Sequence, residues 1–154
     1  MKAMYRFLIP AVRLVLGGMF LFSGLNGFFQ FMPMGQPEGA VGAMMGGLAA
    51  SGYFFPLLFA TQSIVGVLLL WGRLVPLALT VLAPIMVNIV AFHVFLAPDG
   101  LVMAVALGLM QLYLAYVYRD AFAGLLRLKT TPKWTPAEER PDNAPMPDML
   151  EETT

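Results

Sequence analysis

The side chains of this chain that could take part in chemistry are few, and they lie within long apolar stretches. The single histidine, His93, can pair with a quinone carbonyl, exchange a proton near the outer surface or serve as one axial ligand of haem. It can equally be a neutral ring that donates to a backbone carbonyl or to an amide such as Asn26. With one histidine in the chain, bis-histidine haem held by one chain is excluded, and the lack of cysteine excludes disulfides and thiolate ligands.

A stripe of polar and small residues follows one helix face of the first apolar stretch, at the spacing i, i+3, i+4, i+7: Ser23, Asn26, Gly27 and Gln30. We expect Asn26 and Gln30 to line an outward-opening cavity with Asn88 and His93, in which a quinone or a lipid is held. Asn88 and His93 lie five residues apart, about 140° around an ideal helix, so they need not face the same cavity.

Two further amides, Gln62 and Gln111, fall near the midpoints of their apolar stretches. In one interpretation they bond across helix interfaces, at about 0.6 kcal/mol each, where small residues such as Gly66 and Gly108 let helices approach. In another they form, with Asn88, the central polar path of a small-molecule carrier. The absence of Asp and Glu from the interior of every apolar stretch, and of inverted repeats, argues against a carrier.

Arg13 is the charged residue that lies inside an apolar stretch, and it is close enough to the start for its side chain to reach lipid headgroups. The sequence contains no nucleotide-binding loop, no motif that pairs a nucleophile with a base and no cluster of metal ligands. We therefore predict no catalytic residue and no metal site, and we do not expect catalysis by this chain unaided.

The composition indicates the elements that must position these residues. Of the 154 residues 59% are apolar and 12% are charged, and the mean hydropathy is +0.76. A hydrocarbon core of about 30 Å takes about 20 apolar residues per helical crossing. Four stretches are of that order: residues 7–32, 53–71, 75–97 and 101–119. The sequence therefore predicts an all-α polytopic membrane protein, with a four-transmembrane-helix antiparallel bundle inside a membrane domain of residues 1–129.

The connections refine this bundle. Only residues 72–74 and 98–100 separate the last three stretches, so successive helices there must be antiparallel neighbours. Pro84 removes one backbone hydrogen bond from the third helix and predicts a kink. The longer first connection contains the segment Gly39 to Ala50, which is apolar but too short to span the membrane. An interfacial or re-entrant helix and a lid over the mouth of the bundle both remain open for it.

Positive charge falls on one side of this arrangement, which predicts that both termini are cytoplasmic. The residues on that side are Lys2, Arg6, Arg73, Arg119, Arg127, Lys129 and Lys133. We expect the last helix to continue into the cytoplasm to about residue 128, with Arg127 and Lys129 near anionic headgroups. Residues 130–154 hold six acids and five prolines, a composition that predicts a disordered acidic, Pro-rich cytoplasmic tail able to bind a partner.

Three segments resemble the DoxX-like family of small membrane proteins. They are RLVLGGMFLFSGLNGFF (13–29), SGYFFPLLFATQSIVGVLLLWGR (51–73) and LAPIMVNIVAFHVFLAP (82–98), and the resemblance extends over about residues 7–120. The third segment is the most similar, with Pro84, Asn88 and His93 in the pattern of many relatives. Many members carry an acid where this chain has Gln62, so a role in proton handling does not carry over.

The resemblance implies a four-helix bundle in a family named after a subunit associated with archaeal quinone-linked oxidation of sulfur compounds. Other members are linked to redox complexes, to enzyme maturation and to the escort of clients. We therefore expect a non-catalytic accessory subunit of a membrane-bound, quinone-linked electron-transfer complex, with lipid and other membrane subunits as partners and no nucleic acid. A membrane assembly factor or scaffold that holds a client is the alternative. The family's distribution implies a bacterial inner membrane.

Overall fold

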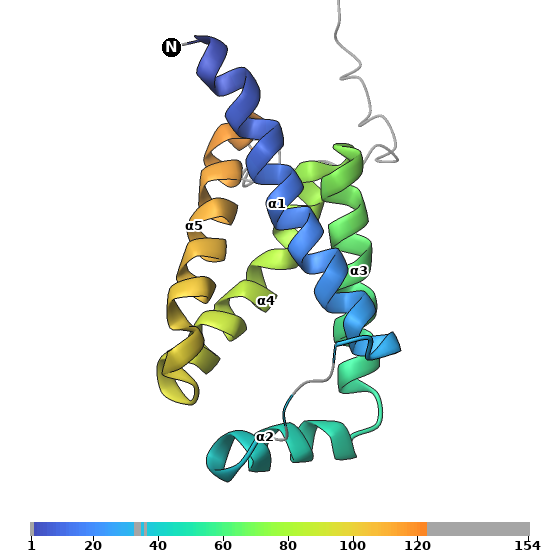
Figure 1. Ribbon diagram of the computed structural model, residues 1–154. Helices are drawn as coiled ribbons and strands as arrows, with labels where there is room; N and C mark the ends of the chain where they lie inside the picture. The colour runs from blue at the N-terminus through green and yellow to red at the C-terminus, as the bar shows by residue number, and fades with distance from the viewer. Residues whose placement is uncertain (1, 33–34, 36, 123–154) are drawn as a thin grey trace, which may run out of the picture. The chain divides into compact units, whose positions relative to one another are not determined.

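The computed structural model describes residues 2–32, 35 and 37–122, and this part of the chain is built from helices (Figure 1). They are α1 (Lys2–Phe29), α2 (Gly39–Ala50), α3 (Phe54–Trp71), α4 (Val75–Phe95), the 3₁₀ turn η1 (Pro98–Gly100), α5 (Leu101–Val117) and α6 (Arg119–Phe122). Four segments are long and apolar enough to cross a membrane: residues 7–29, 54–71, 75–95 and 98–117. The predicted all-α polytopic membrane fold is confirmed.

Some helix ends differ from the sequence expectation. α1 ends at Phe29 rather than at residue 32, because Gln30 takes a left-handed φ of 49° and its N–H closes on the Asn26 carbonyl at 2.8 Å. α5 ends at Val117, where Tyr118 leaves the helical region (φ −93°, ψ 14°) and separates α5 from α6. The predicted continuation to residue 128, with Arg127 and Lys129, and the predicted tail of residues 130–154 lie outside the described residues.

α1 and α3 pack against each other along much of their length, and glycines set the distance between them. A Cβ built on Gly66 would fall 2.5 Å from the backbone nitrogen of Leu21. One built on Gly17 would fall 2.9 Å from the Cβ of Leu69. Because real carbon atoms do not approach so closely, these two positions of the interface have room for glycine alone. Faces of small residues allow the two backbones to lie close together, as they do between other membrane helices.

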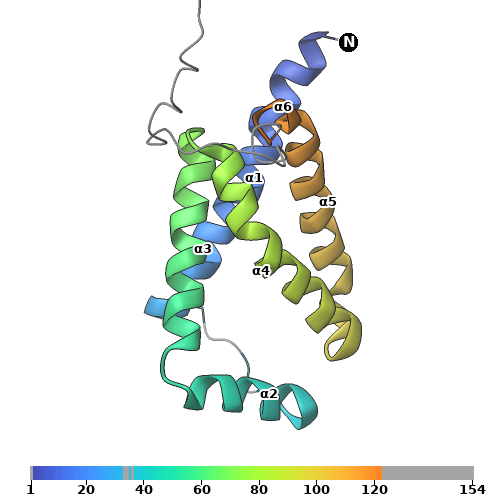
Figure 2. The ribbon, with the colours of Figure 1, turned by 180° about the vertical axis from the view of Figure 1, so that it is seen from behind.

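α4 pairs with α5 and bends away from α3 in its second half (Figure 2). Pro84 lies inside α4, where it cannot donate to the carbonyl of Thr80, so a bend is expected at this point. Five residues before the proline, the carbonyl of Leu79 accepts a hydrogen bond of 3.1 Å from Gln111 Nε2 of α5. This bond ties α5 to α4 where the bend begins.

The packed core lies in the half of the bundle next to the α3–α4 link. It consists of Leu16, Phe20, Val65, Leu69, Val75, Ala78, Leu79, Leu82, Met86 and Leu114. On α4 the buried residues end at Met86, and on α3 they begin at Gln62. The bundle is therefore closed near the α3–α4 link and open near its other end, where α2 lies across it (Figure 1).

Candidate functional site

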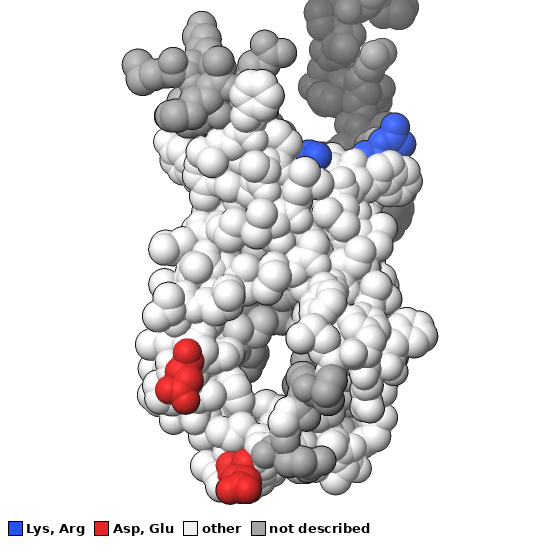
Figure 3. Space-filling model, in the orientation of Figure 1, with Lys and Arg blue, Asp and Glu red and all other residues white. Residues whose placement is uncertain are grey.

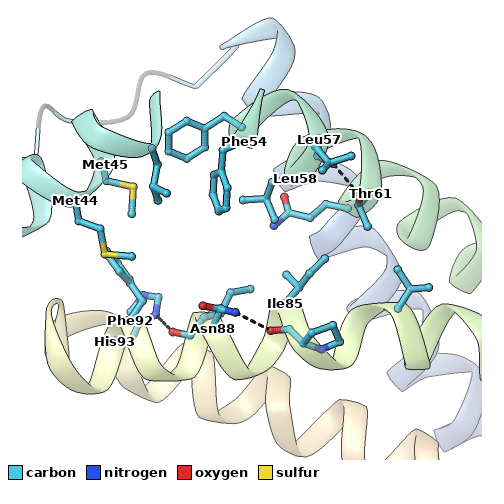
Figure 4. A pocket seen from close by; sticks show the side chains of 16 residues that line it. Met44, Met45, Phe54, Leu57, Leu58, Thr61, Ile85, Asn88, Phe92 and His93 are labelled. Atoms are coloured by element: carbon cyan, nitrogen blue, oxygen red, sulfur yellow. Dashed lines mark hydrogen bonds between the residues drawn. The ribbon is translucent and has the colours of Figure 1, made fainter. Parts of the chain in front are cut away.

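A cavity of about 490 Å³ opens between α2, α3 and α4, on the side where α4 diverges from α3 (Figure 4). Its volume lies in the range of small-molecule sites. Most of the lining is apolar or aromatic: Met44, Met45, Leu48, Phe54, Phe55, Leu57, Leu58, Val81, Pro84, Ile85, Ile89 and Phe92. Four polar side chains complete it: Thr61, Gln62, Asn88 and His93. An apolar cavity with a few polar groups suits an amphipathic ligand.

Three of the polar groups on this wall bond to their own helices. The Thr61 hydroxyl donates at 2.8 Å, and Asn88 Nδ2 at 3.2 Å, each to the backbone carbonyl four residues earlier. His93 Nδ1 lies 2.7 Å from the carbonyl four residues before it. Because a carbonyl oxygen only accepts, Nδ1 of His93 must carry a proton. These bonds hold the three side chains against the cavity wall.

His93 is also held by the turn that follows α4. Its ring packs edge-on to Phe92, with ring centroids 5.3 Å apart, and lies against Gly100 of η1. A Cβ at position 100 would collide with the imidazole, so the glycine leaves room for it. Asn88 and His93 line one cavity although they lie about 140° apart around an ideal helix, because the cavity covers a broad face of α4 that also includes Ile85, Ile89 and Phe92.

Gln62 joins the cavity to the α1–α3 interface. Its side chain is buried, with 6% exposed, and its Oε1 accepts a hydrogen bond of 3.3 Å from the Ser23 hydroxyl of α1. Gln62 also lines the cavity, so its Nε2 is the group left to face a ligand. The same residue thus bonds across a helix interface, as one interpretation of the sequence had it, and contributes to the cavity.

Asn26 and Gln30, which the sequence analysis placed in the same cavity as Asn88 and His93, lie outside its lining. Asn26 is buried and pairs with the backbone of Met32: its Oδ1 accepts from the Met32 N–H at 2.7 Å and its Nδ2 donates to the Met32 carbonyl at 3.2 Å. Gln30 is exposed in the left-handed position that ends α1. Asn26 therefore holds the end of α1, and the structure brings only Asn88 and His93 of the four predicted residues together.

A second, almost wholly apolar groove of about 440 Å³ lies between α4 and α5. Its lining includes three small residues, Ala83, Ala91 and Gly108, and one polar residue, Gln111. Gln111 is buried and donates to α4 through Nε2, while its Oε1 is buried without a partner among the described residues. Gln111 therefore bonds across a helix interface and retains one unused acceptor.

Cationic side chains gather at the end of the bundle that holds the α3–α4 link. The guanidinium of Arg13 lies against Gly72, the left-handed cap of α3, where the unpaired carbonyls of a helix end attract a cation. Arg73 lies over the ring of Trp71, and Arg119 over that of Tyr116, with cation-to-centroid distances of 5.4 and 4.8 Å. Such aromatic and cationic pairs are typical of a membrane interface.

The two ends of the described part differ in charge. In Figure 3, Lys and Arg lie at one end of the face shown, and Asp and Glu at the other. Glu38 precedes α2 and Asp99 lies in η1, while Asp120 pairs with Arg119 at the cationic end at 3.8 Å. The cavity therefore opens towards the end of the bundle that carries acids and the α2 crossing. Within residues 2–32, 35 and 37–122, no group of three or more potential metal ligands occurs.

Of the lining residues, the sequence predicted only Asn88 and His93 for a cavity. Thr61, a polar residue on the α3 wall, was not predicted. Met44 and Met45 reach into the cavity from α2 (Figure 4). The signal available for them was a pair of long, flexible side chains in a segment otherwise made of glycine, alanine and small aliphatic residues.

The comparisons with known proteins bear on four of the helices described above. A family model described as DoxX matches residues 8–97, more than half of the chain. The match includes α2, α3, α4 and all but the start of α1, and it ends before α5. No curated protein and no solved structure matches the chain.

Proposed function

The chain belongs to the DoxX family of membrane proteins, and from this we propose that it is a non-catalytic accessory subunit of a membrane-bound, quinone-linked electron-transfer complex. In this role it holds an amphipathic quinone in the cavity between α2, α3 and α4, beside larger subunits that transfer the electrons. The observation that carries the proposal is the cavity itself, because an apolar lining with a few polar groups suits an amphipathic ligand.

The lining fits a quinone in chemistry and in size. A quinone has an apolar ring with oxygen atoms at opposite edges, and a long apolar tail. The cavity offers aromatic surface from Phe54, Phe55 and Phe92, and polar groups on two different helices. Methionine side chains from α2 adapt readily to a flexible tail, since Met is unbranched and has several rotatable bonds. When bound, the quinone supplies the redox chemistry, and this chain's residues bind and orient it.

The charge distribution supports an orientation in the membrane. Arg13, Arg73 and Arg119 lie at the end of the bundle with the α3–α4 link, while Glu38 and Asp99 lie at the other. By the positive-inside rule, we propose that the end with the arginines is cytoplasmic, together with both termini, in a bacterial inner membrane. The cavity and α2 would then face the outer side.

The test of this function begins with the native complex. The chain, carrying a C-terminal tag, is captured from gently solubilised native membranes, and both the co-purifying subunits and the visible absorption spectrum are recorded. We expect recovery with pigmented redox subunits, because an accessory subunit copurifies with the subunits that carry its cofactors. Recovery of the chain alone, colourless, would contradict the proposal.

A second measurement assigns the cavity to that function. In membranes from a strain that carries only the variant chain, Asn88→Leu is expected to lower quinone-dependent turnover at limiting quinone several-fold and to leave turnover at saturating quinone nearly unchanged. Val102→Leu is the matched control, since Val102 is 83% exposed on α5 and lines neither cavity nor groove. Equal turnover in both variants at limiting quinone would show that the cavity does not contribute to quinone-dependent turnover.

A second candidate function is that of an assembly factor that holds a client by one transmembrane helix. The α4–α5 groove favours it, because the small residues of its lining, Ala83, Ala91 and Gly108, suit close helix packing. Gly108→Leu would fill the groove: a Cβ at this position has its nearest neighbour 3.8 Å away, so the fold has room for the change. Loss of partner recovery in this variant, with the cavity variants unaffected, would favour this function.

A further inference from the structure

Three of the four polar side chains that line the α2–α3–α4 cavity share one arrangement. Thr61, Asn88 and His93 each donate a hydrogen bond to the backbone carbonyl four residues earlier, at 2.8, 3.2 and 2.7 Å. The direction of these bonds is certain on chemical grounds, because a backbone carbonyl accepts and never donates. Within the part of the chain that the structure describes, the acceptor atoms of these three residues are therefore left without a partner: the Thr61 oxygen, Asn88 Oδ1 and, on a neutral ring, His93 Nε2. Asn88 Nδ2 also keeps a second N–H.

These acceptors belong to two facing walls, with Thr61 on α3 and Asn88 on α4, both at the cavity (Figure 4). The Nε2 edge of His93 lies against Gly100, so His93 is the least available of the three. A ligand that carries only acceptors, such as a carbonyl or an ether, cannot form a hydrogen bond with the Thr61 oxygen, because the Thr61 hydrogen is already donated to the Leu57 carbonyl. An apolar setting makes such an unsatisfied group costly.

From this geometry we propose that the cavity selects an apolar molecule with a hydroxyl hydrogen-bond donor. In the quinone series it would bind the reduced quinol in preference to the oxidised quinone. The part that concerns quinols rests on the proposed function, whereas the preference for a hydroxyl rests on the cavity alone.

Two donors on the lining decide how strong the preference is. Gln62 Nε2 has no hydrogen-bond partner among the described residues, and Asn88 Nδ2 keeps a second N–H. A carbonyl or ether oxygen can accept from these donors but leaves the Thr61 oxygen and Asn88 Oδ1 unpaired. A hydroxyl both accepts and donates, so it forms at least one hydrogen bond more. One such bond changes affinity by about two- to tenfold.

The experiment compares two probes that differ only in the donor: 4-nonylphenol and its methyl ether, 4-nonylanisole. The full chain is reconstituted in lipid nanodiscs, each probe is equilibrated by dialysis, and binding is counted above that of empty nanodiscs. We expect the phenol to bind about two- to tenfold more tightly than the ether. The double variant Thr61→Val/Asn88→Leu should bring this ratio close to one.

Thr80→Val is the matched control. Thr80 is exposed on α4, lies outside the cavity lining and donates to the Pro76 carbonyl at 2.9 Å, so the variant loses the same kind of intrahelical bond as Thr61→Val. Its phenol-to-ether ratio should equal that of the wild type. Equal binding of phenol and ether by the wild type would overturn the inference, as would binding of neither probe or a ratio that survives in the double variant.

A second arm compares a decyl-substituted benzoquinol with the corresponding benzoquinone under anaerobic conditions. Tighter binding of the quinol supports the inference, and tighter binding of the quinone overturns its quinol part. The two proposals fail in different ways. A phenol preference in a chain that never copurifies with redox subunits would contradict the accessory role and support the hydroxyl preference. Recovery of a pigmented complex whose chain shows no phenol preference would support the accessory role and contradict the hydroxyl preference.

Discussion

α3 meets its two neighbours in opposite ways. Against α1 it is closed, with Gly66 and Gly17 bringing the backbones so near that a single added carbon has no room. Against α4 it is packed only in its C-terminal half, which holds Val65 and Leu69. From Phe54 to Gln62 the two helices lie apart around a cavity. Both interfaces are built from similarly apolar sequences.

The difference shows that hydropathy alone does not decide where a membrane bundle is tight. Helices in lipid gain little from burying apolar side chains against each other, so close packing depends on shape. Small residues give α1 and α3 complementary surfaces, and the proline bend removes that complementarity between α3 and α4. The open half is therefore the part of the fold that is free to hold a ligand.

The largest effect should come from adding one methyl group to the closed interface. Gly66→Ala places a Cβ against the backbone of Leu21, which cannot move without separating α1 from α3. We expect a loss of about 1–3 kcal/mol in the free energy of unfolding, as for other overpacked sites. The measurement is reversible unfolding in mixed detergent–SDS micelles, followed by tryptophan fluorescence.

Gly18→Ala is the control for this variant. Gly18 is on the same helix as Gly17, but a Cβ there meets no atom within 4 Å, so the change should be neutral or slightly stabilising. Equal destabilisation by the two alanines would show that glycine packing does not hold the closed interface.

A smaller loss is expected at the end of α1. Asn26→Ala removes both hydrogen bonds to Met32 and leaves a backbone N–H without its partner, which should cost about 1–2 kcal/mol. Ser23→Ala, which removes one longer bond of 3.3 Å to Gln62, should cost less in the same assay. If Asn26→Ala proves as mild as Ser23→Ala, Asn26 has a role other than ending the helix.

Gln111→Leu should have a still smaller effect. The variant loses the bond to the Leu79 carbonyl, worth about 0.6 kcal/mol on average for such interhelical contacts. It also removes a buried Oε1 that lacks a partner among the described residues, which offsets part of the loss. The free energy of unfolding in micelles measures the net change. A loss above about 2 kcal/mol would mean that this bond holds the bend of α4.

The smallest effect is expected where the bundle is open. Leu58→Phe enlarges a side chain that borders the cavity, so it should leave the free energy of unfolding nearly unchanged. The same substitution at Leu69, which is fully buried on the same helix, should cost about 1–3 kcal/mol. Comparable losses at the two positions would contradict the contrast between the closed and open halves.

The sequence predicted the membrane architecture because its signals are local. Long apolar runs and three-residue links already specify four crossings and antiparallel neighbours, and the helix Gly39–Ala50 was visible as an apolar segment too short to span. The cross-helix bonding of Gln62 and Gln111 was also foreseeable, since amides at membrane depth need partners and the neighbouring faces are small. The crossings and links depend on residues close together in the chain, and the need of an amide for a partner at membrane depth depends on the residue itself.

The composition of the cavity depended on the tertiary structure. Asn26 and Gln30 lie on the polar face of α1, but a helix face indicates only a direction around one axis, not the element that lies opposite. The turn after α1 pairs its own backbone with Asn26, while Asn88 and His93, which follow Pro84 in α4, line the same cavity as Thr61. The physical reason is that a cavity forms between helices, so its membership follows from where the helix axes diverge, which no single segment of sequence encodes.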